Sequence, residues 1–567
     1  MAIPRMLFLI TAAVLSAHTA FAANPILRQK YTADPNPFVW NDRLYVYASY
    51  DNNNPSSSGY DIKFYTLMSS DDMANWTDHG EVFSVGRDGP SGYNQAYAPG
   101  AAVKDNRVYL YIPNGGSGIG VATAVRPEGP FTGGKTLITG NAANNTNVPW
   151  LFDPAGFVDT DGQGYIYFGG GPADGNPGPG SNLRAAKLGG DMMSATWPAT
   201  TITGTTRSFE AAYMHKNGST YYFTFSQNFT NGSADIAYMT GTNPMGPFTF
   251  KGTMLPNSAS GGGNNHAGVV QYKNNWYVFY HDRKLRKTNN VSSGEYRSVS
   301  VDKLEYNTDG TMKQVVATDA GPDQIKKLNP YDTILATTIH TQSGAIKTAI
   351  CSAPSPGTIS NSNANSAGTA GDRNVMLISI ANNSWVRLKG VDFGTAGAAK
   401  FYASAASASA GGSIEIRTGS QTGTLVGTCN IGATGGLTTW KTIECDISNC
   451  TGVKDYLYLV FKGTGTDQFR LRWYKFGGAI EISPETPTSV ANVGGTHVRK
   501  PFSINVRGKT LFITAASPTV VEIYNIKGGK ITSLNISGAT RTVNLSLPDG
   551  VYFAKARGIP NVKFVVR

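Results

Sequence analysis

The sequence predicts an all-β protein: a five-bladed β-propeller, followed by a β-sandwich module of the jelly-roll type and a small C-terminal β-sandwich. Only 15% of the 567 residues are charged, which disfavours coiled coils and helix bundles. Aromatic residues make up 11%, too many for a disordered chain. A Tyr-rich hairpin pattern also recurs five times in the first 320 residues. Together these observations favour β-structure with many turns.

The N-terminus predicts an export signal over residues 1–22. Arg5 is followed by a short apolar run that starts at Met6, and the segment ends in Ala20-Phe21-Ala22. A charged start, a short apolar core and a small-x-small exit are typical of a cleaved secretory signal. About a dozen apolar residues are too few to span a membrane as an anchor. We therefore expect a secreted or cell-surface protein with no transmembrane segment after signal removal.

The five repeats predict the blades of a propeller within residues 23–325. Each has a short apolar strand, a polar turn and an alternating Tyr-rich strand, as in PFVWNDRLYVYASY and GVVQYKNNWYVFYHD. Turns such as Asn-Asp, Asp-Gly and Asn-Asn connect twisted hairpin strands well. The residues that lead the repeats are Asp34, Ala98, Asp153, Glu210 and His266, at steps of 64, 55, 57 and 56. A period of this length with several strands fits propeller blades, whose closure protects the sheet edges.

The leading position of the repeat carries the chemistry. Innermost strands of a propeller converge on a central channel, so the five leading residues are expected to meet there. Three of them are acids, on a chain that is poor in charge. Converging acids shift one another's pKa values, as in active sites. A protonated acid and an ionised base held apart on separate blades, at about 6.5–9.5 Å, are the equipment of an inverting glycoside hydrolase.

Residues 24–316 resemble glycoside hydrolase family 43, a family of inverting enzymes with a five-bladed propeller. The resemblance is carried by TADPNP, LFDPAGFVDTDG and FEAAYMHKNGSTYYFTFS. It implies that Asp34 is the general base, Glu210 the general acid, and Asp153 the residue that tunes the pKa of Glu210 and orients it. The motif NNHAGVVQYKNNWYVFYHD matches His266 to the family's central histidine, with structural positioning, substrate contact or calcium as its role. No cofactor is expected to be required.

Three aromatic residues are candidates for the mouth of the pocket: Tyr93, Tyr97 and Trp150. They would stack on sugar rings, or else pack between blades. EAAYMHKNGSTYYFTFS, NPMGPFTFKGTML and RSVSVDKLEYNTDGTM resemble family members that remove α-L-arabinofuranosyl side groups from arabinoxylan. The alternatives are a β-xylosidase, an arabinan-degrading enzyme and a non-catalytic sugar-binding propeller. The expected partner is plant cell-wall arabinoxylan or xylan.

Residues 335–482 are expected to form the second domain. Alternating runs such as SWVRLKGVDFG, GSIEIRTGS and YLYLVFKG predict a β-sandwich, and NNSWVRLKGVDFG and TTWKTIECDI resemble carbohydrate-binding module family 6. The resemblance implies that Trp385 and Trp440 sandwich a sugar. However, ILATTIHTQSG and the Gln468–Trp473 segment depart from the family pattern, so a module that has lost its ligand remains the alternative. Four cysteines (Cys351, Cys429, Cys445 and Cys450) fall in this stretch without a zinc spacing, and export would permit any of three disulfide pairings.

The C-terminal part is basic. Between Glu485 and Arg567 there are 11 basic and 3 acidic residues, a net +8 out of the total of +11. The rest of the chain is near neutral, so no nucleic-acid partner is expected. A linker over residues 483–498 leads into a domain over 499–567, whose LPDGVYFAKA segment resembles C-terminal sorting domains of type IX secretion. The resemblance implies contact with the secretion machinery; attachment to the cell surface or to acidic polysaccharide, and a merely solvated basic module, are the alternatives.

Overall fold

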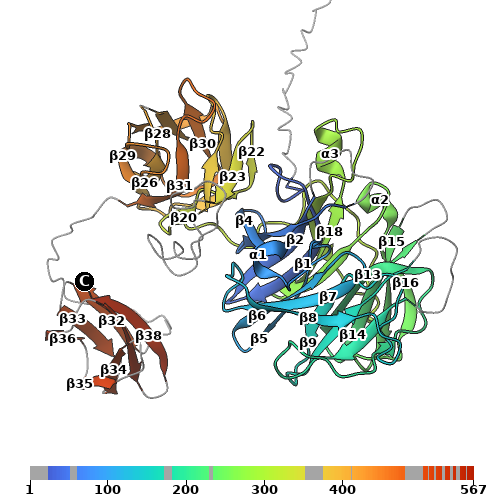
Figure 1. The fold of residues 1–567 in the computed structure, drawn as a ribbon. Coiled ribbons are helices and arrows are strands. Elements are labelled where there is room, and N and C mark those ends of the chain that lie inside the picture. The colour runs from blue at the N-terminus through green and yellow to red at the C-terminus, as the bar shows by residue number, and fades with distance from the viewer. Residues whose placement is uncertain are drawn as a thin grey trace, which may run out of the picture. The chain divides into compact units, whose positions relative to one another are not determined.

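The computed structural model describes residues 23–51, 60–171, 182–228, 234–350, 375–409 and 411–478, together with the strands of the C-terminal domain between 502 and 566. The predicted signal and Cys351 lie outside these residues. The chain divides into two compact units, Met1–Ile480 and Glu481–Arg567. Strands dominate both units, as predicted (Figure 1).

The first unit begins with five antiparallel sheets that form the propeller blades. Blade I contains β1 (Thr32–Trp40), β2 (Arg43–Tyr50), β3 (Phe64–Ser70) and β4 (Trp76–Ser84). Blade II contains β5 (Gly100–Lys104), β6 (Arg107–Pro113), β7 (Gly118–Ala124) and β8 (Thr132–Thr139). Blade III contains β9 (Ala155–Val158), β10 (Gly164–Phe168), β11 (Arg184–Lys187) and β12 (Thr200–Thr201).

Two further blades complete the propeller, and its described residues also include three short helices. Blade IV contains β13 (Ser208–Asn217), β14 (Thr220–Asn228), β15 (Ala234–Gly241) and β16 (Thr249–Leu255). Blade V contains β17 (Ala267–Tyr272), β18 (Asn275–Asp282) and β19 (Ser298–Leu304). The helices are α1 (Val85–Asp88), α2 (Asn257–Ser260) and α3 (Lys284–Thr288). The five-bladed prediction is confirmed.

The repeated hairpins form because their turn residues accept left-handed backbone angles. Asn41 and Asp42 have φ of 46° and 66°, and Lys273 and Asn274 have φ of 48° and 63°. Positive φ at both central residues matches the twist of the flanking strands. In blade V the turn is therefore Lys273-Asn274, one residue earlier than the Asn-Asn pair that the sequence pattern suggested.

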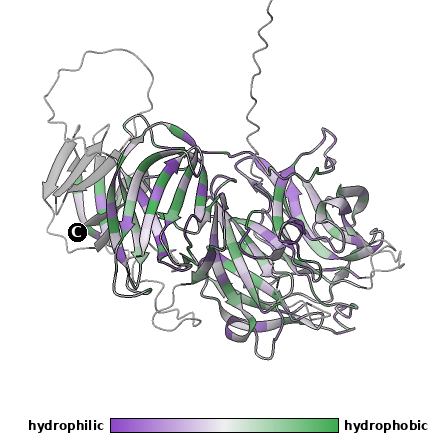
Figure 2. Ribbon diagram, turned by 90° about the horizontal axis from the view of Figure 1, so that it is seen from above, coloured by the Kyte–Doolittle hydropathy of each residue, from purple (hydrophilic) through white to green (hydrophobic). Residues whose placement is uncertain are grey.

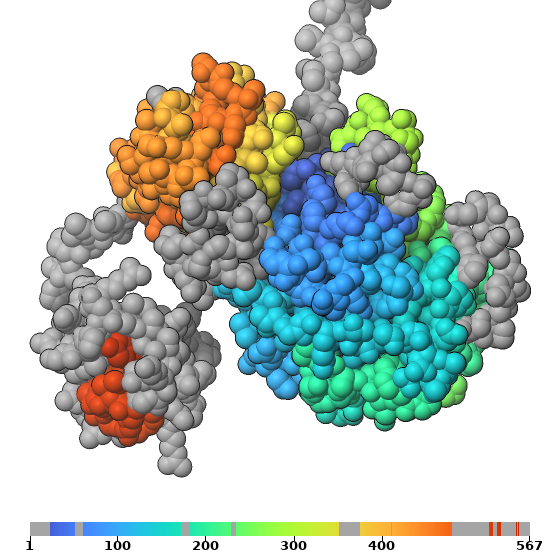
Figure 3. Space-filling view, viewed as in Figure 1, coloured from blue at the N-terminus to red at the C-terminus, as the bar shows by residue number. Residues whose placement is uncertain are grey.

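The inner strands close a ring in the order β1, β5, β9, β13, β17 and back to β1. They approach so closely that glycine is required: a Cβ on Gly268 of β17 would lie 2.3 Å from Pro37 Cδ of β1. The segment that precedes β1 runs along β19 and ties the first and last blades together. The Ile26 N–H donates to the Val299 carbonyl at 2.9 Å, and the Thr32 N–H donates to the Arg297 carbonyl at 2.9 Å. In the space-filling view, blades I and II lie directly against each other (Figure 3).

A β-sandwich follows the propeller within the same unit. Its first sheet has the order β22 (Thr341–Gln342), β25 (Trp385–Asp392), β30 (Val453–Lys462), β27 (Gly412–Thr418), β28 (Thr424–Ile431). Its second sheet has the order β23 (Lys347–Ile350), β24 (Val375–Ile378), β31 (Arg470–Gly477), β26 (Ala398–Ala406), β29 (Lys441–Cys450), with β20 (Ile334–Leu335) also paired to β31. Hydrophobic and hydrophilic residues alternate along these strands (Figure 2), because one face of each sheet packs on the shared apolar core.

The sandwich is joined to blade I by main-chain pairing. Strand β21 (Thr338–Ile339) adds a fifth strand to the blade I sheet by pairing with β4. The Asn75 side chain completes an amide pair with the backbone of Lys389: it donates to the carbonyl at 2.9 Å and accepts from the N–H at 2.8 Å. These two contacts are neutral and partly buried.

The second unit is a small β-sandwich, as predicted. One sheet has the order β32 (Phe502–Arg507), β33 (Thr510–Ala515), β36 (Thr540–Asn544). The other has the order β35 (Lys530–Ile536), β34 (Thr519–Asn525), β37 (Gly550–Ala556), β38 (Ile559–Val566). Within the described residues, no helix has the length and apolar character needed to cross a membrane.

Candidate active site

The three predicted acids project from irregular points of the backbone: Asp34 lies in β1, Glu210 lies in β13, and Asp153 comes shortly before β9. The pairing of β1 with β2 shifts register between Ala33 and Asn36, and that of β13 with β14 shifts on both sides of Glu210. Asp34 and Asp153 have φ of 52° and 47°, a left-handed region that non-glycine residues rarely adopt. Bulges and such backbone angles re-aim side chains and cluster near active sites.

The structure brings the predicted residues together at the centre of the ring. His266 Nδ1 lies 3.8 Å from Asp34 Oδ1 and 3.7 Å from Asp153 Oδ2. The charge of Asp153, and then that of Asp34, acts on the carboxyl group of Glu210. All four side chains are buried, with exposures of 5–8%. The fifth leading residue, Ala98, is also buried and precedes β5.

Asp34 is held in its ionised form. Arg297 Nη1 donates to Asp34 Oδ1 at 2.8 Å, and the Ser49 hydroxyl donates to Oδ2 at 2.6 Å. His281 Nδ1 lies 3.1 Å from Oδ1. Burial opposes ionisation, but the Arg297 charge and the His281 contact outweigh it and hold the pKa of Asp34 well below its usual range. A carboxylate that stays charged at neutral pH suits a general base.

Arg297 is itself fixed by a second carboxylate, Asp51, which directly follows β2. The Arg297 Nε and Nη2 atoms donate to the two oxygens of Asp51 at 2.9 and 2.7 Å, and the Arg297 N–H donates to Oδ2 at 2.8 Å. The Arg297 guanidinium also lies over the Tyr60 ring, 4.7 Å from its centroid. A two-pronged pair of this kind fixes orientation as well as charge. The Asp34 carboxylate is therefore positioned through Arg297 by Asp51.

Glu210 and Asp153 show the opposite behaviour. Burial, followed by the charge of Asp34, raises the pKa of Asp153 to about 8, although the Ala211 N–H donates to Asp153 Oδ2 at 2.9 Å. Burial, followed by the charges of Asp153 and Asp34, raises the pKa of Glu210 well above its usual range. Asp153 and Glu210 therefore both remain protonated at a pH where Asp34 is ionised. Neighbouring carboxyl groups whose pKa values are shifted in opposite directions can serve as the acid and the base of one reaction.

His266 is a neutral member of the cluster. Burial lowers its pKa to about 4, so the imidazole is uncharged near neutral pH. Calcium takes six to eight oxygen ligands, whereas no group of three or more His, Cys, Asp or Glu side chains within the described ranges is placed to hold a metal ion. Calcium at His266 stays an untested prediction.

The three predicted aromatic residues have different surroundings. Trp150 packs edge-on against Phe152 and Phe209, with ring centroids 5.5 and 5.6 Å apart. These two residues directly precede Asp153 and Glu210, so the half-buried Trp150 ring adjoins the acids. The half-buried Tyr97 packs against Tyr60, 6.0 Å between centroids, and Tyr60 in turn lies under Arg297.

Tyr93 is placed as a packing residue of blade II. A Cβ on Gly120 of β7 would lie 3.1 Å from the Tyr93 ring, and one on Gly118 would lie 3.3 Å from its hydroxyl. Tyr93 therefore packs over β7, where Gly118 and Gly120 have no side chains that would clash with its ring. Trp150 and Tyr97 remain the candidates for sugar contact, because only they adjoin residues that touch the acid cluster.

Sequence reasoning missed the groups that support the acids. These are Ser49, Asp51, Tyr60, Asn264, His281 and Arg297. Asn264 hydrogen-bonds to Glu210 and donates to the Tyr60 hydroxyl at 3.2 Å. Arg297 opens the RSVSVDK motif and His281 lies within FYHD. An ionisable side chain within or directly beside an otherwise apolar strand was the available signal for both.

The structure does not support an open sugar sandwich between Trp385 and Trp440. Trp385 begins β25 of the first sandwich sheet, is 7% exposed, and packs against Tyr458 with ring centroids 5.2 Å apart. Trp440 precedes β29 of the second sheet, is half-buried, and has the Arg472 guanidinium 5.1 Å from its centroid. Trp385 is therefore corrected to a buried packing residue, because an exposure of 7% leaves too little of the ring accessible for a sugar to stack on it. Trp440 keeps part of its surface.

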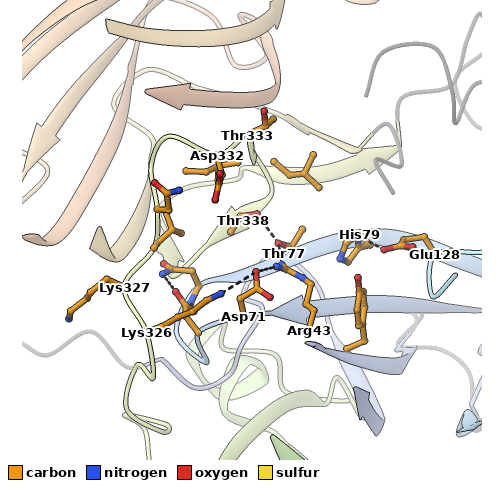
Figure 4. Close-up of a pocket in the computed structure, with 17 residues that line it drawn as sticks. Arg43, Asp71, Thr77, His79, Glu128, Lys326, Lys327, Asp332, Thr333 and Thr338 are labelled. Atoms are coloured by element: carbon orange, nitrogen blue, oxygen red, sulfur yellow. Dashed lines mark hydrogen bonds and ion pairs between the residues drawn. The ribbon is translucent and has the colours of Figure 1, made fainter. Parts of the chain in front are cut away.

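A cavity of about 360 Å³ lies elsewhere, where blade I meets the segment that leads to the sandwich (Figure 4). None of the three acids lines it. Its charged groups pair with one another: Arg43 with Asp71, and His79 Nδ1 at 4.0 Å from Glu128. The Thr77 and Thr338 hydroxyls lie 2.8 Å apart across it. The chemistry of the protein belongs to the ring centre and not to this joint.

A propeller whose centre holds an ionised carboxylate opposite a protonated one is built for glycoside hydrolysis. Comparison with known proteins agrees with this class. Residues 22–312 match the model of glycosyl hydrolases family 43, and residues 354–478 match carbohydrate binding module family 6. The chain belongs to glycosyl hydrolases family 43 and carries a family 6 module.

Several relatives match most of the chain. The arabinoxylan arabinofuranohydrolase of Paenibacillus polymyxa is 35% identical, over 92% of this chain and 88% of the relative. The arabinoxylan arabinofuranohydrolase of Bacillus subtilis is 38% identical, over 80% of this chain and 92% of the relative. A crystal structure of a family 43 arabinoxylan arabinofuranohydrolase from Bacillus subtilis, in complex with cellotetraose, has a TM-score of 0.72 and 38% identity, and the match covers 81% of this chain and 98% of that one.

Proposed function

We propose that the protein is an inverting hydrolase that removes α-L-arabinofuranosyl side groups from arabinoxylan. The observation that carries the proposal is the pairing of a charged Asp34 with protonated carboxyls on two other blades of the same ring. Relatives that match both the propeller and the sandwich are named arabinoxylan arabinofuranohydrolases. This two-domain likeness favours arabinofuranose over xylose as the released sugar.

The reaction needs one displacement. Asp34 accepts a proton from water as the water oxygen attacks the anomeric carbon of the sugar. Glu210 donates its proton to the glycosidic oxygen on the opposite face, so that the carbon–oxygen bond breaks and the xylan hydroxyl leaves neutral. Attack opposite the leaving group inverts the anomeric configuration. Asp34 then loses its proton to solvent and Glu210 regains one.

Asp153 acts on Glu210 and not on the sugar. Above its own pKa of about 8, where Asp153 is ionised, its charge is the largest electrostatic contribution, after burial, to the raised pKa of Glu210. Its Oδ2 accepts from the backbone N–H of Ala211, the residue next to Glu210. Asp153 therefore orients the acid-bearing strand, and it keeps Glu210 protonated when it is itself ionised, whereas burial and the Asp34 charge do so when Asp153 is neutral.

The test is product analysis with purified full-length protein. Arabinoxylan and, separately, linear xylo-oligosaccharides are incubated with the parent, Glu210→Gln and Asp235→Asn, and released sugars are separated by chromatography. Asp235 is a suitable control because it is a buried carboxylate of the same blade whose partner is Thr253, at 2.9 Å, and not the acid cluster. Arabinose from the parent and from Asp235→Asn, but not from Glu210→Gln, is the expected result.

Other outcomes redirect the assignment. Xylose from the oligosaccharides would make the protein a β-xylosidase, and sugar from arabinan alone would make it an arabinan-degrading enzyme. Binding of xylan with no released sugar would leave a binding propeller. Proton NMR during the first turnovers tests inversion, because an inverting enzyme releases β-arabinofuranose before mutarotation.

We also propose that the protein is exported by the segment 1–22 and that the unit Glu481–Arg567 acts in sorting or surface attachment. Support comes from the signal pattern and the LPDGVYFAKA motif, and from the separate β-sandwich that this unit forms. Deletion of residues 499–567 in a host with type IX secretion should leave the enzyme active but retained inside the cell. Unchanged export of the deleted form would contradict a sorting role.

A further inference from the structure

Two cysteines of the sandwich lie against each other from different sheets. Cys429 is in β28, the last strand of the first sandwich sheet, and Cys445 is in β29, the last strand of the second. Both are thiols in this structure. The thiol of Cys429 hydrogen-bonds to that of Cys445.

The backbone places these side chains opposite each other. A Cβ on Gly427 would lie 2.9 Å from the Asp446 carbonyl and 2.5 Å from Ile447 Cγ2, so β28 and β29 approach closely. The two strands are consecutive and pack on each other without hydrogen-bonded pairing. Residues two positions apart on a strand share a face. Cys429 is two residues after Gly427 and Cys445 is two residues before Ile447, so the two cysteines face each other as Gly427 and Ile447 do. The contact therefore follows from strand register as well as from the thiols themselves.

We propose that Cys429 and Cys445 form a disulfide that locks the two sheets of the sandwich together at their open edge. The ladder of the first sheet ends at β28, and that of the second ends at β29. Main-chain hydrogen bonds hold each sheet internally but do not join these two strands. A covalent bond supplies the missing connection between them.

Other pairings among the described cysteines are excluded by distance. Cys450 is five residues beyond Cys445 on the same strand, and because a register shift lies between them their partners on β26, Ala398 and Phe401, are three residues apart, which corresponds to about 10 Å. Disulfides need Cα atoms within about 7 Å, so Cys445 cannot pair with Cys450. For the same reason a Cys429 that faces Cys445 is out of reach of Cys450. Of the three pairings that the sequence left open, only the one containing Cys429–Cys445 is compatible with these strands.

The two thiols have unequal roles in forming the bond. Cys445 is partly exposed, whereas Cys429 has an exposure of 0%. The hydrogen bond from Cys429 lowers the pKa of Cys445, and the nearby Lys400 acts in the same direction. An accessible thiol with a lowered pKa is the one that attacks first.

Oxidation is a two-step exchange with a disulfide, such as oxidised glutathione or a secreted thiol–disulfide oxidoreductase. The Cys445 thiolate attacks one sulfur of that disulfide, which forms a mixed disulfide and releases the other sulfur as a thiolate. Cys429 then gives up its proton to solvent and attacks Cys445 Sγ, which expels the second thiolate. The reagent gains two electrons, and the sandwich loses two thiol hydrogens.

The test uses purified, reduced, full-length protein in an oxidised glutathione buffer. Free thiols are blocked at intervals, and peptides are mapped by mass spectrometry without reduction. We expect a linked pair of peptides that contain Cys429 and Cys445 and a protein lighter by two hydrogens for this bond. Cys445→Ser should leave Cys429 slow to react with the blocking reagent, because Cys429 is buried.

A thermal measurement tests the mechanical role. Closing a loop of this length is expected to raise the Tm of the sandwich by roughly 5–10 °C. Reductant should lower the Tm of Cys450→Ser by that amount, and should not lower that of the triple variant Cys450→Ser/Cys429→Ala/Cys445→Ala, in which no bond to Cys450 can contribute. Mapping that links either thiol to another cysteine, or thiols that stay free or glutathionylated under oxidation, would overturn the proposal. Because none of these readouts uses a sugar, they are independent of the proposed activity.

Discussion

The centre of the propeller and the core of the sandwich are both buried, but the first consists of ionisable side chains and the second of apolar ones. At the centre, Asp34, Asp51, Asp153, Glu210 and Arg297 are all buried, with exposures of at most 8%. The main apolar cluster of the sandwich contains, within the described residues, aliphatic and aromatic side chains and cysteines. Burying charge costs free energy unless partners compensate, whereas burying apolar surface stabilises the fold. The first region is therefore organised for chemistry and the second for stability.

Backbone geometry shows the same difference. Asp34, Asp153 and Ala211 have φ of 52°, 47° and 60° at or beside the acids, whereas in the sandwich Ser379 and Asn383 have such angles in the segment between β24 and β25. Non-glycine residues in this region store strain that the surrounding structure must hold. Strain at the ring centre fixes where the carboxyl groups point. Changes at the centre should thus alter rate more than stability, and changes in the sandwich core should do the reverse.

The largest expected effect is on the two reacting acids. Asp34→Asn and Glu210→Gln should each lower kcat/KM on arabinoxylan by about 10²–10⁴-fold, because each removes one proton transfer. An aryl arabinofuranoside with a good leaving group separates the roles, since it needs no acid. Glu210→Gln should regain most of its loss on that substrate and Asp34→Asn should not. Equal losses of both variants on both substrates would break the assignment.

Asp51→Asn should have the next largest effect on rate. Loss of a charged partner that fixes Arg297 removes hydrogen bonds worth about 1.5–3 kcal/mol, or about 10–100-fold in kcat. A less ordered Arg297 also holds the pKa of Asp34 less far below normal. The acid limb of the pH–rate profile should therefore move to higher pH. A lower rate with an unmoved acid limb would mean that Asp51 supports the fold and does not position the base.

Asp153→Asn should change how stability depends on pH. The pKa of Asp153 is about 8 in the folded protein and about 4 in an unfolded chain. Between these values the folded state binds more protons than the unfolded state, so this group makes stability fall as pH rises. Removing it should give a Tm difference, variant minus parent, that grows from pH 4 to pH 8. A difference that stays constant over this window would show that Asp153 is not protonated in the folded state.

Trp440→Ala should have a smaller effect, confined to polymeric substrate. If the half-buried ring contacts polysaccharide, its loss should weaken retention on insoluble xylan by a few-fold, corresponding to about 1 kcal/mol. Turnover of a small aryl glycoside should stay unchanged. Trp385→Ala serves as the matched control: it should lower the Tm of the sandwich by creating a cavity. Equal effects of both changes on xylan retention would contradict the different surroundings of the two rings.

The smallest effect on activity is expected for Phe461→Ala in the sandwich core. Phe461 is 0% exposed, and loss of such a ring costs about 3–5 kcal/mol of folding free energy. Activity on the aryl glycoside at low temperature should remain at the parent level. A large loss of kcat alongside the loss of stability would show that the sandwich core and the ring centre are coupled. It would contradict the division between a region for chemistry and a region for stability.

The propeller and its acids could be predicted from the sequence because the hairpin motif recurs at nearly regular intervals. Asp34, Asp153, Glu210 and His266 share one position of the repeat, so their meeting follows from blade geometry. Asp51 and Arg297 lie outside that position, at the end of β2 and before β19, and they meet by ring closure. A long-range pair of this kind has no local pattern.

In the sandwich, periodicity predicted the strands but not the use of their outer faces. Trp385 alternates correctly with Val386 and Leu388, whose side chains belong to the core. Alternation places Trp385 on the other face of the sheet, yet that face is also buried at this point, against Tyr458 and Val460. Burial by a packed neighbour depends on the three-dimensional assembly and cannot be predicted from alternation.

The two-residue strand β21 makes the first unit difficult to divide. Because it caps β4, a propeller cut off before Thr338 would expose the backbone N–H and C=O groups of a sheet edge. Uncapped edges are templates for pairing with other chains. The shortest soluble catalytic fragment should therefore retain residues beyond Ile339, and exchanging the family 6 module for another one would require a donor that brings its own capping strand.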